Sequence, residues 1–189
     1  GMALLSWGAI ALMMPLKEKV PYLLRENITT GGVDIIGTLS DREIAYSDVR
    51  DKYWLRQYVL NYETYDWNTI QVNYDNVLAF SGKNAGAEYA SIFQGKDALD
   101  KKYGQKIKVI VRVVSVVPNG NGVGTVRFTR ETKNVEDTSQ GSITQWVATI
   151  GYTYRNPSSM KESLRNVNPF AFQVTSYRVD PESTPEGRP

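Results

Sequence analysis

Residues 107–128, IKVIVRVVSVVPNGNGVGTVRF, predict two antiparallel strands joined by a tight turn. Apolar residues at every second position share one face of the first strand: Ile107, Val109, Val111 and Val113. The Asn-Gly-Asn-Gly run after Pro118 favours the left-handed backbone of a hairpin turn. Val126 and Phe128 continue the apolar face in the second strand. Because a short turn needs no crossover helix, this segment indicates an antiparallel meander.

Two further strands are expected after the hairpin. One face of the first carries a regular series of large and apolar residues: Trp146, Ala148, Ile150, Tyr152 and Tyr154. The second runs from Phe172 to Val179, and we expect a loop from Asn156 to Asn168. The tail over 183–189 consists largely of Pro, Glu, Gly and Arg, and is expected to be disordered.

Helical periodicity replaces the alternation upstream of these strands. Apolar residues recur three and four positions apart on both sides of Tyr65 and Asp66, so we predict two helices that break there. Ser40 or Asp41 is expected to cap the first helix, and Asp66 the second. A third helix is expected from Ala85 to Tyr103.

Two short strands are also expected between Val20 and Leu39, on either side of the turn residues 29–32. The order along the chain is therefore strands, three helices and an antiparallel meander. Helices segregated from an antiparallel sheet indicate the α+β class. We expect the three helices to cover the concave face of a strongly curved sheet of about four to five strands.

The composition excludes several classes of function. A chain of 189 residues with 41% hydrophobic and 22% charged residues fits one globular domain. Its formal net charge of +2 gives no indication of nucleic-acid binding. The sequence contains no Cys and no His, which excludes thiolate and imidazole metal sites and Ser-His-Asp catalysis. We predict no cofactor and no enzymatic activity.

The N-terminal residues have three interpretations. Gly1-Met2 resembles the remnant of an expression tag, and residues 3–16 carry no charge before Lys17. Residues 3–16 are the outer end of a transmembrane helix, an apolar helix of the core, or the remnant of a signal peptide. The lack of any polar face favours the transmembrane helix, although a bilayer core needs about 20 apolar residues.

Several stretches resemble the VirB8 family of bacterial type IV secretion systems. The most specific stretch is residues 168–182, NPFAFQVTSYRVDPE. Shorter matches lie at residues 15–22, 58–67, 75–81, 125–128 and 146–152. One departure is Ala171, which stands where the family usually has Gly. If that position needs a positive φ, alanine costs roughly 1 kcal/mol or more.

The resemblance implies a fold like that of nuclear transport factor 2 (NTF2). It also implies a single N-terminal transmembrane helix, ending within residues 1–16, and a periplasmic domain over residues 17–182 at the bacterial inner membrane. The family role is a non-catalytic assembly component. It self-associates, which we expect to give a homodimer, and contacts VirB9-, VirB10- and VirB4-like components.

Seven residues are candidates for protein contacts. The resemblance implies that the segment Asn168, Pro169, Phe170 and Ala171 takes part in self-association, whereas its residue types also suit the start of a strand. Tyr58, Tyr62 and Tyr65 are candidates for bordering a groove between helix and sheet, because tyrosine is enriched at binding hot spots.

Other residues have weaker claims to a function. Trp67 is expected in the core, and Arg127, Arg130 and Arg155 are interpreted as part of a solvated sheet face. The alternative function is a small-molecule binder, isomerase or dehydratase on the same fold, for which Asp75 and Tyr74 are the available pair. Because Asp75 lies off the apolar stripe of its helix, we expect it to point away from the interior.

Overall fold

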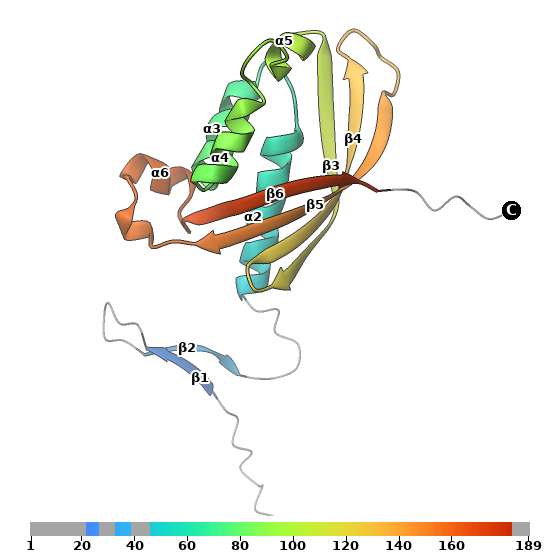
Figure 1. Cartoon of the computed structure of the whole chain (residues 1–189). Helices are drawn as coiled ribbons and strands as arrows, with labels where there is room; N and C mark the ends of the chain where they lie inside the picture. Colours follow the sequence, from blue (N-terminus) through green and yellow to red (C-terminus); the bar gives the residue numbers. More distant parts are fainter. Residues whose placement is uncertain (1–21, 27–32, 39–45, 183–189) are drawn as a thin grey trace, which may run out of the picture. The chain divides into compact units, whose positions relative to one another are not determined.

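The computed structural model describes residues 22–26, 33–38 and 46–182 (Figure 1). The chain divides into two compact units, residues 1–44 and 45–189. In the first, β1 (Tyr22–Glu26) and β2 (Val33–Thr38) pair antiparallel, which confirms the two predicted strands. The expected membrane segment, the helix caps at Ser40 and Asp41 and the C-terminal tail lie outside the described residues.

The second unit contains the predicted meander. Its sheet has the order β3-β4-β5-β6, and every neighbouring pair is antiparallel. The strands are β3 (Ile107–Gly120), β4 (Val123–Asn134), β5 (Ser142–Tyr154) and β6 (Phe172–Pro181). Asn121 and Gly122 connect β3 to β4 with φ values of 52° and 70°, the left-handed pair that a two-residue hairpin turn needs.

Helices cover one side of this sheet (Figure 1). They are α2 (Tyr46–Glu63), α3 (Ile70–Phe80), α4 (Lys83–Ser91), α5 (Leu99–Tyr103) and α6 (Glu162–Val167). The gap between α2 and α3 confirms the predicted break near Tyr65. Asp66 does not cap α3, because the N-cap of that helix is Thr69. The Asp66 Oδ1 atom instead accepts the Asn68 N–H at 3.0 Å and stabilises the turn before α3.

Two of the predicted elements are wrong in extent. The third helix splits into α4 and α5 because Gly95 adopts a φ of 82°, which no helix accommodates. The loop expected from Asn156 to Asn168 contains a 3₁₀ turn (Pro157–Ser159) and α6. Asn156 and the proline after it cap that turn, and the same residue types are equally typical of loops.

The core lies between α2 and the inner face of the sheet. Its fully buried residues from α2 are Leu55, Tyr58 and Val59, and those from the sheet include Val126, Ile150 and Val174. A Cβ on Gly124 would overlap with the Leu55 side chain, so glycine lets α2 lie close to β4. The α+β class and the helix-covered antiparallel sheet of four strands are confirmed.

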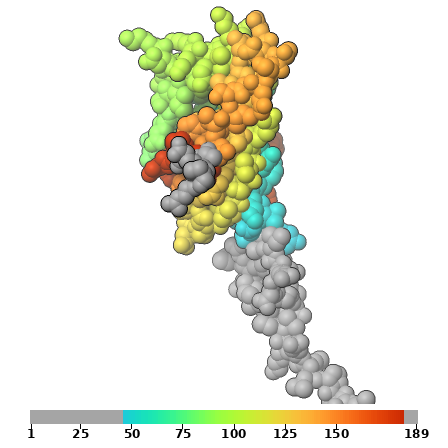
Figure 2. All heavy atoms as spheres, turned by 90° about the vertical axis from the view of Figure 1, so that its right-hand side faces the viewer, coloured from blue at the N-terminus to red at the C-terminus, as the bar shows by residue number. Residues whose placement is uncertain are grey.

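Figure 2 views the domain from the right-hand side of Figure 1, where the yellow and orange residues of the strands take up much of the visible face. None of the helices in the part of the chain that the structure describes has the length and apolar character needed to cross a bilayer.

Candidate functional site

Asn168 is a buried structural residue. It is 1% exposed, and its Nδ2 donates to the carbonyl oxygens of Ala79 at 3.2 Å and Phe172 at 2.8 Å. Its Oδ1 accepts the Phe172 N–H at 2.9 Å. The side chain therefore joins the end of α3 to the start of β6, and its amide group is fully used inside the fold.

The three residues after Asn168 divide between interior and surface. Ala171 is buried with a φ of 51°, so this position does adopt the left-handed backbone that glycine favours. Pro169 and Phe170 are exposed. Phe170 is 52% exposed, and its ring centre lies 6.4 Å from that of Trp54 on α2. The motif thus places one aromatic ring at the surface beside α2.

The three tyrosines considered as groove residues lie largely inside the fold. Tyr58 on α2 and Tyr65, which follows that helix, are buried, and their hydroxyls bond to the Ser81 hydroxyl and the Gly104 carbonyl. Tyr62 is half-buried, and its ring centre lies 4.1 Å from that of Tyr177. Trp67 was expected in the core and is 44% exposed, because it lies in the turn before α3.

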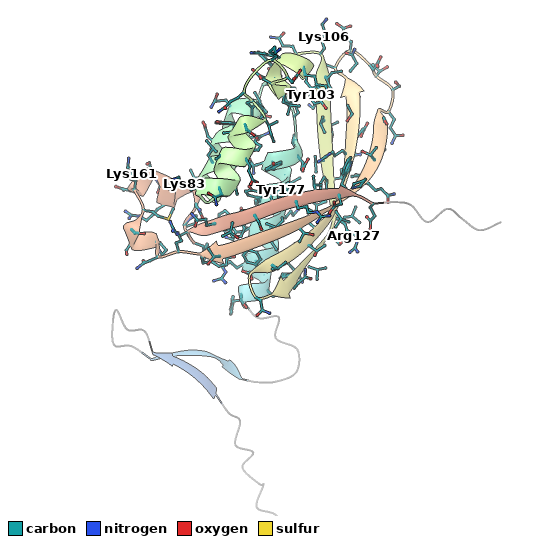
Figure 3. The ribbon with its side chains drawn as sticks, in the orientation of Figure 1. Lys83, Tyr103, Lys106, Arg127, Lys161 and Tyr177 are labelled. Atoms are coloured by element: carbon teal, nitrogen blue, oxygen red, sulfur yellow. The ribbon has the colours of Figure 1, made fainter. Side chains whose placement is uncertain are left out.

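A polar cluster lies behind these rings, where α2, β4 and β6 meet. The Tyr177 hydroxyl donates to Glu63 Oε1 at 2.5 Å, and Arg130 forms an ion pair with the other carboxylate oxygen. Tyr177 lies on the helix side of β6 (Figure 3). The Glu63 side chain is 6% exposed. Burial raises the pKa of Glu63, whereas Arg130 and the Tyr177 hydroxyl favour its charged form.

The sequence interpretation of Arg130 is therefore wrong. Its guanidinium lies 4.2 Å from the Trp146 ring centre and is largely buried, rather than belonging to a solvated sheet face. Its partner Glu63 is distant in sequence and no local pattern connects the two residues. A buried ion pair that bridges helix and sheet fixes their relative position more than it offers a reactive group.

A second polar cluster fixes the beginning of α2 to β5. The Asp51 carboxylate accepts hydrogen bonds from the hydroxyls of Tyr152 and Tyr154, both at 2.7 Å. The Arg50 guanidinium lies 3.8 Å above the Tyr154 ring centre. Burial raises the pKa of both tyrosines, with hydrogen bonding to the Asp51 carboxylate as the next cause.

The pair considered for catalysis does not lie in an apolar cone. Asp75 is exposed, as expected, and its Oδ1 accepts from Gln71 Nε2 at 3.0 Å. The space between the helices and the sheet is filled by aromatic rings, among them Tyr58, Tyr62, Tyr89 and Tyr177.

The outer face of α2 presents an apolar stripe to solvent. Its members are Tyr46, Val49 and Tyr53 on α2, together with Phe170. Tyr46 is 88% exposed. The Tyr53 ring contacts Trp54 edge-on, and Trp54 in turn contacts Phe170, so the α2 stripe continues onto the Asn-Pro segment. The spacing of Tyr46, Val49 and Tyr53 places them on one face of α2. That face is exposed, whereas a different face of the helix, with Leu55 and Tyr58, is buried in the core.

Comparison with known proteins identifies the family. The sequence model of the VirB8 protein family matches residues 1–182. The type IV secretion system protein virB8 of Brucella abortus is 54% identical over 173 residues, covering 92% of this chain and 72% of the relative. PtlE of Bordetella pertussis, also a type IV secretion system protein, is 37% identical over 179 residues, covering 95% and 77%.

A solved relative has the same fold. The crystal structure of a TrwG component of the type IV secretion system from Bartonella birtlesii has a TM-score of 0.71 and 46% sequence identity. It covers 77% of this chain and all of the relative. The fold is NTF2-like, as the sequence resemblance implied. The chain thus belongs to the VirB8 family and is a component of a type IV secretion system.

Proposed function

We propose that the chain is a non-catalytic assembly component of the secretion channel, which acts by self-association and by contacts with other channel proteins. Membership of the VirB8 family supports this role. The carboxylates of Glu63 and Asp51 are both engaged in hydrogen bonds that link helix to sheet. Such cross-links are typical of a rigid domain that acts by binding other proteins through its surface.

The observation that carries the proposal is the α2 stripe. Isolated exposed apolar residues are common, whereas a run of aromatic and aliphatic side chains along one helix face marks a contact surface. Tyr46, Val49 and Tyr53 are all more than half exposed, and Phe170 extends the stripe. We propose that a second copy of the chain covers it, giving a homodimer.

Family membership supports a proposal for the location and the partners. We propose that residues 17–182 lie in the periplasm and that residues 1–16 belong to an inner-membrane anchor, supported by their lack of charge. The proposed partners are the VirB9-, VirB10- and VirB4-like components. Because a second copy covers the α2 stripe in the proposed dimer, the outer surface of the sheet is the face that we propose for these contacts.

Sedimentation equilibrium of residues 17–189 tests self-association. We expect a concentration-dependent dimer in the wild type and at least tenfold weaker dimerisation in Tyr53→Ser and Phe170→Ser. Val72→Ser is the matched control, because Val72 is 62% exposed on α3 but lies outside the stripe. A strict monomer at high concentration, or equal effects of all three substitutions, contradicts the proposal.

A further inference from the structure

A groove of about 210 Å³ lies between α3 and the α4–α5 segment. Its lining residues all come from the helical part of the domain: Ile70, Gln71, Tyr74, Phe93 and Asp100. None of them belongs to the α2 stripe or to the sheet. This α3–α5 groove is therefore separate from the surface proposed for self-association.

The aromatic walls of the groove are fixed in place. The rings of Tyr74 and Phe93 meet edge to face, with centres 5.3 Å apart. Both rings also pack on Tyr89, at 5.6 Å and 5.4 Å, and Tyr89 is buried in the core. Because a buried ring supports them, these walls need little reordering to receive a ligand.

Asp100 adds an unpaired carboxylate to this aromatic lining. Its Oδ1 is buried and has no hydrogen-bond partner within the described part of the chain. The two lysines that follow it in α5 are directed elsewhere. Lys101 Nζ donates to the Gly95 carbonyl at 2.9 Å, and Lys102 Nζ lies 6.0 Å from the Tyr103 ring centre.

A carboxylate that is partly buried, with neither a positive charge nor a hydrogen-bond donor beside it, is unfavourable. The Asp100 carboxylate therefore favours a ligand that carries a positive charge and N–H donors. A second acidic group adjoins the lining, since Gln71 Nε2 donates to the Asp75 carboxylate at 3.0 Å. Aromatic faces also attract cations. The chemistry of the groove is thus that of a cation site with apolar walls.

We propose that the α3–α5 groove binds the side chain of an arginine presented by a partner protein. A guanidinium is planar, stacks on aromatic faces and donates strong charge-assisted hydrogen bonds to carboxylate oxygens. The volume also favours a single side chain, because pockets for drug-sized molecules start at about 300 Å³. This proposal depends on the proposed function in one respect, which is that the partner carrying the arginine is another channel protein.

The test uses the ¹⁵N-labelled chain and the peptide acetyl-Gly-Arg-Gly-amide, with acetyl-Gly-Gln-Gly-amide as the neutral counterpart. We expect the arginine peptide alone to give saturable NMR shifts at the amides of Gln71, Tyr74 and Asp100. Added salt should weaken binding, because the contact is between opposite charges. Equal shifts with both peptides, or no saturable shift, overturn the proposal.

Two substitutions separate the groove from its surroundings. Asp100→Asn should weaken binding of the arginine peptide at least fivefold, whereas Asp97→Asn changes an exposed aspartate outside the lining and should leave binding unchanged. Tyr74→Leu, which removes one ring, should also weaken binding, and thermal unfolding shows whether each variant is folded. Equal binding by folded Asp100→Asn and wild type refutes the proposal.

Self-association provides an independent readout. Sedimentation of Asp100→Asn should show the same dimerisation as the wild type, since Asp100 lies outside the α2 stripe. If arginine binding fails while dimerisation persists, the groove proposal alone is wrong. If dimerisation fails while binding persists, the error lies in the proposed function.

Discussion

The side chain of Asn168 exchanges two hydrogen bonds with the main chain of Phe172, accepting from its N–H at 2.9 Å and donating to its carbonyl at 2.8 Å. Two residues paired across an antiparallel ladder exchange bonds in the same way. The amide group therefore acts as an additional ladder position at the start of β6. The third bond, to the Ala79 carbonyl, connects that position to α3.

Asn168→Ala should destabilise the domain strongly. Each buried backbone group that loses its partner costs about 1–3 kcal/mol, so we expect a loss of at least about 2 kcal/mol in the free energy of unfolding. Urea unfolding followed by circular dichroism measures it. Pro169→Ala is the control, because Pro169 is exposed and its loss should cost less than about 1 kcal/mol, mainly through a freer unfolded chain. Similar losses in both variants contradict a structural role for Asn168.

Ala171→Gly should stabilise the domain. At a φ of 51°, the left-handed backbone destabilises a folded alanine by about 1–2 kcal/mol, and glycine avoids this strain. Glycine in turn makes the unfolded chain more flexible, which lowers the free energy of unfolding by about 0.4–1 kcal/mol. The net gain is up to about 1.6 kcal/mol, measurable as a higher urea midpoint with an unchanged slope. The same substitution at Ala148, a buried strand residue, should instead destabilise. A lower midpoint for Ala171→Gly would show that its methyl group outweighs the strain.

The strands could be predicted from the sequence because alternation over many residues is a strong local signal, as in Ile107 to Val113. The third helix was overextended because a single glycine, Gly95, determines where α4 and α5 separate. Which face of α2 is buried could not be predicted, since Tyr46 and Tyr58 are equally typical of a core face and only tertiary packing distinguishes them.

The site was harder to predict than the fold. The Asn-Pro segment is distinctive in sequence, but the residue type alone does not show that Asn168 faces inward and Phe170 outward. The Glu63–Arg130 pair and the α3–α5 groove both depend on residues brought together from distant segments. Contacts between residues that are distant in sequence produce no periodic pattern in the sequence, so they are found only in the structure.

Arg130→Met should destabilise the domain at neutral pH. It leaves the Glu63 carboxylate, whose side chain is 6% exposed, without its positively charged partner. Breaking a buried pair costs about 3–5 kcal/mol, and we expect the lower end because a carboxylate with a raised pKa can take up a proton. Asp180→Asn breaks the exposed pair with Arg178 and is the control, expected within about 1 kcal/mol of wild type. Equal effects would mean that the Glu63–Arg130 pair is not buried in solution.

The pH dependence of stability should change when Glu63 is replaced by glutamine. Burial raises the pKa of Glu63 above its usual 4.5, so the folded state holds this proton more tightly than the unfolded chain. This contribution to stability is complete below pH 4.5 and is lost as the pH rises through the pKa of folded Glu63. Unfolding free energies measured at successive pH values should show this decline in the wild type and not in Glu63→Gln. Parallel profiles contradict the raised pKa.

The domain should unfold in alkali because so many of its tyrosines are buried. Burial is the largest cause of raised pKa values in Tyr58, Tyr62, Tyr65, Tyr89, Tyr152, Tyr154 and Tyr177. The pKa of Tyr62 rises from 10.0 to about 12. Unfolded chains release these protons near pH 10 while the folded domain retains them, so stability present below pH 10 is lost between about pH 10 and 12.

Tyrosinate absorbance and far-ultraviolet circular dichroism, followed together with rising pH, check this prediction. We expect part of the tyrosinate signal to appear only in a late, cooperative step that coincides with loss of the helical signal. Tyr62→Phe keeps the ring contacts with Tyr89 and Tyr177 and removes one ionisable group, so its alkaline midpoint should be higher than that of the wild type. Full ionisation of every tyrosine near pH 10 without loss of circular dichroism would show that these hydroxyls are accessible to water in the folded domain.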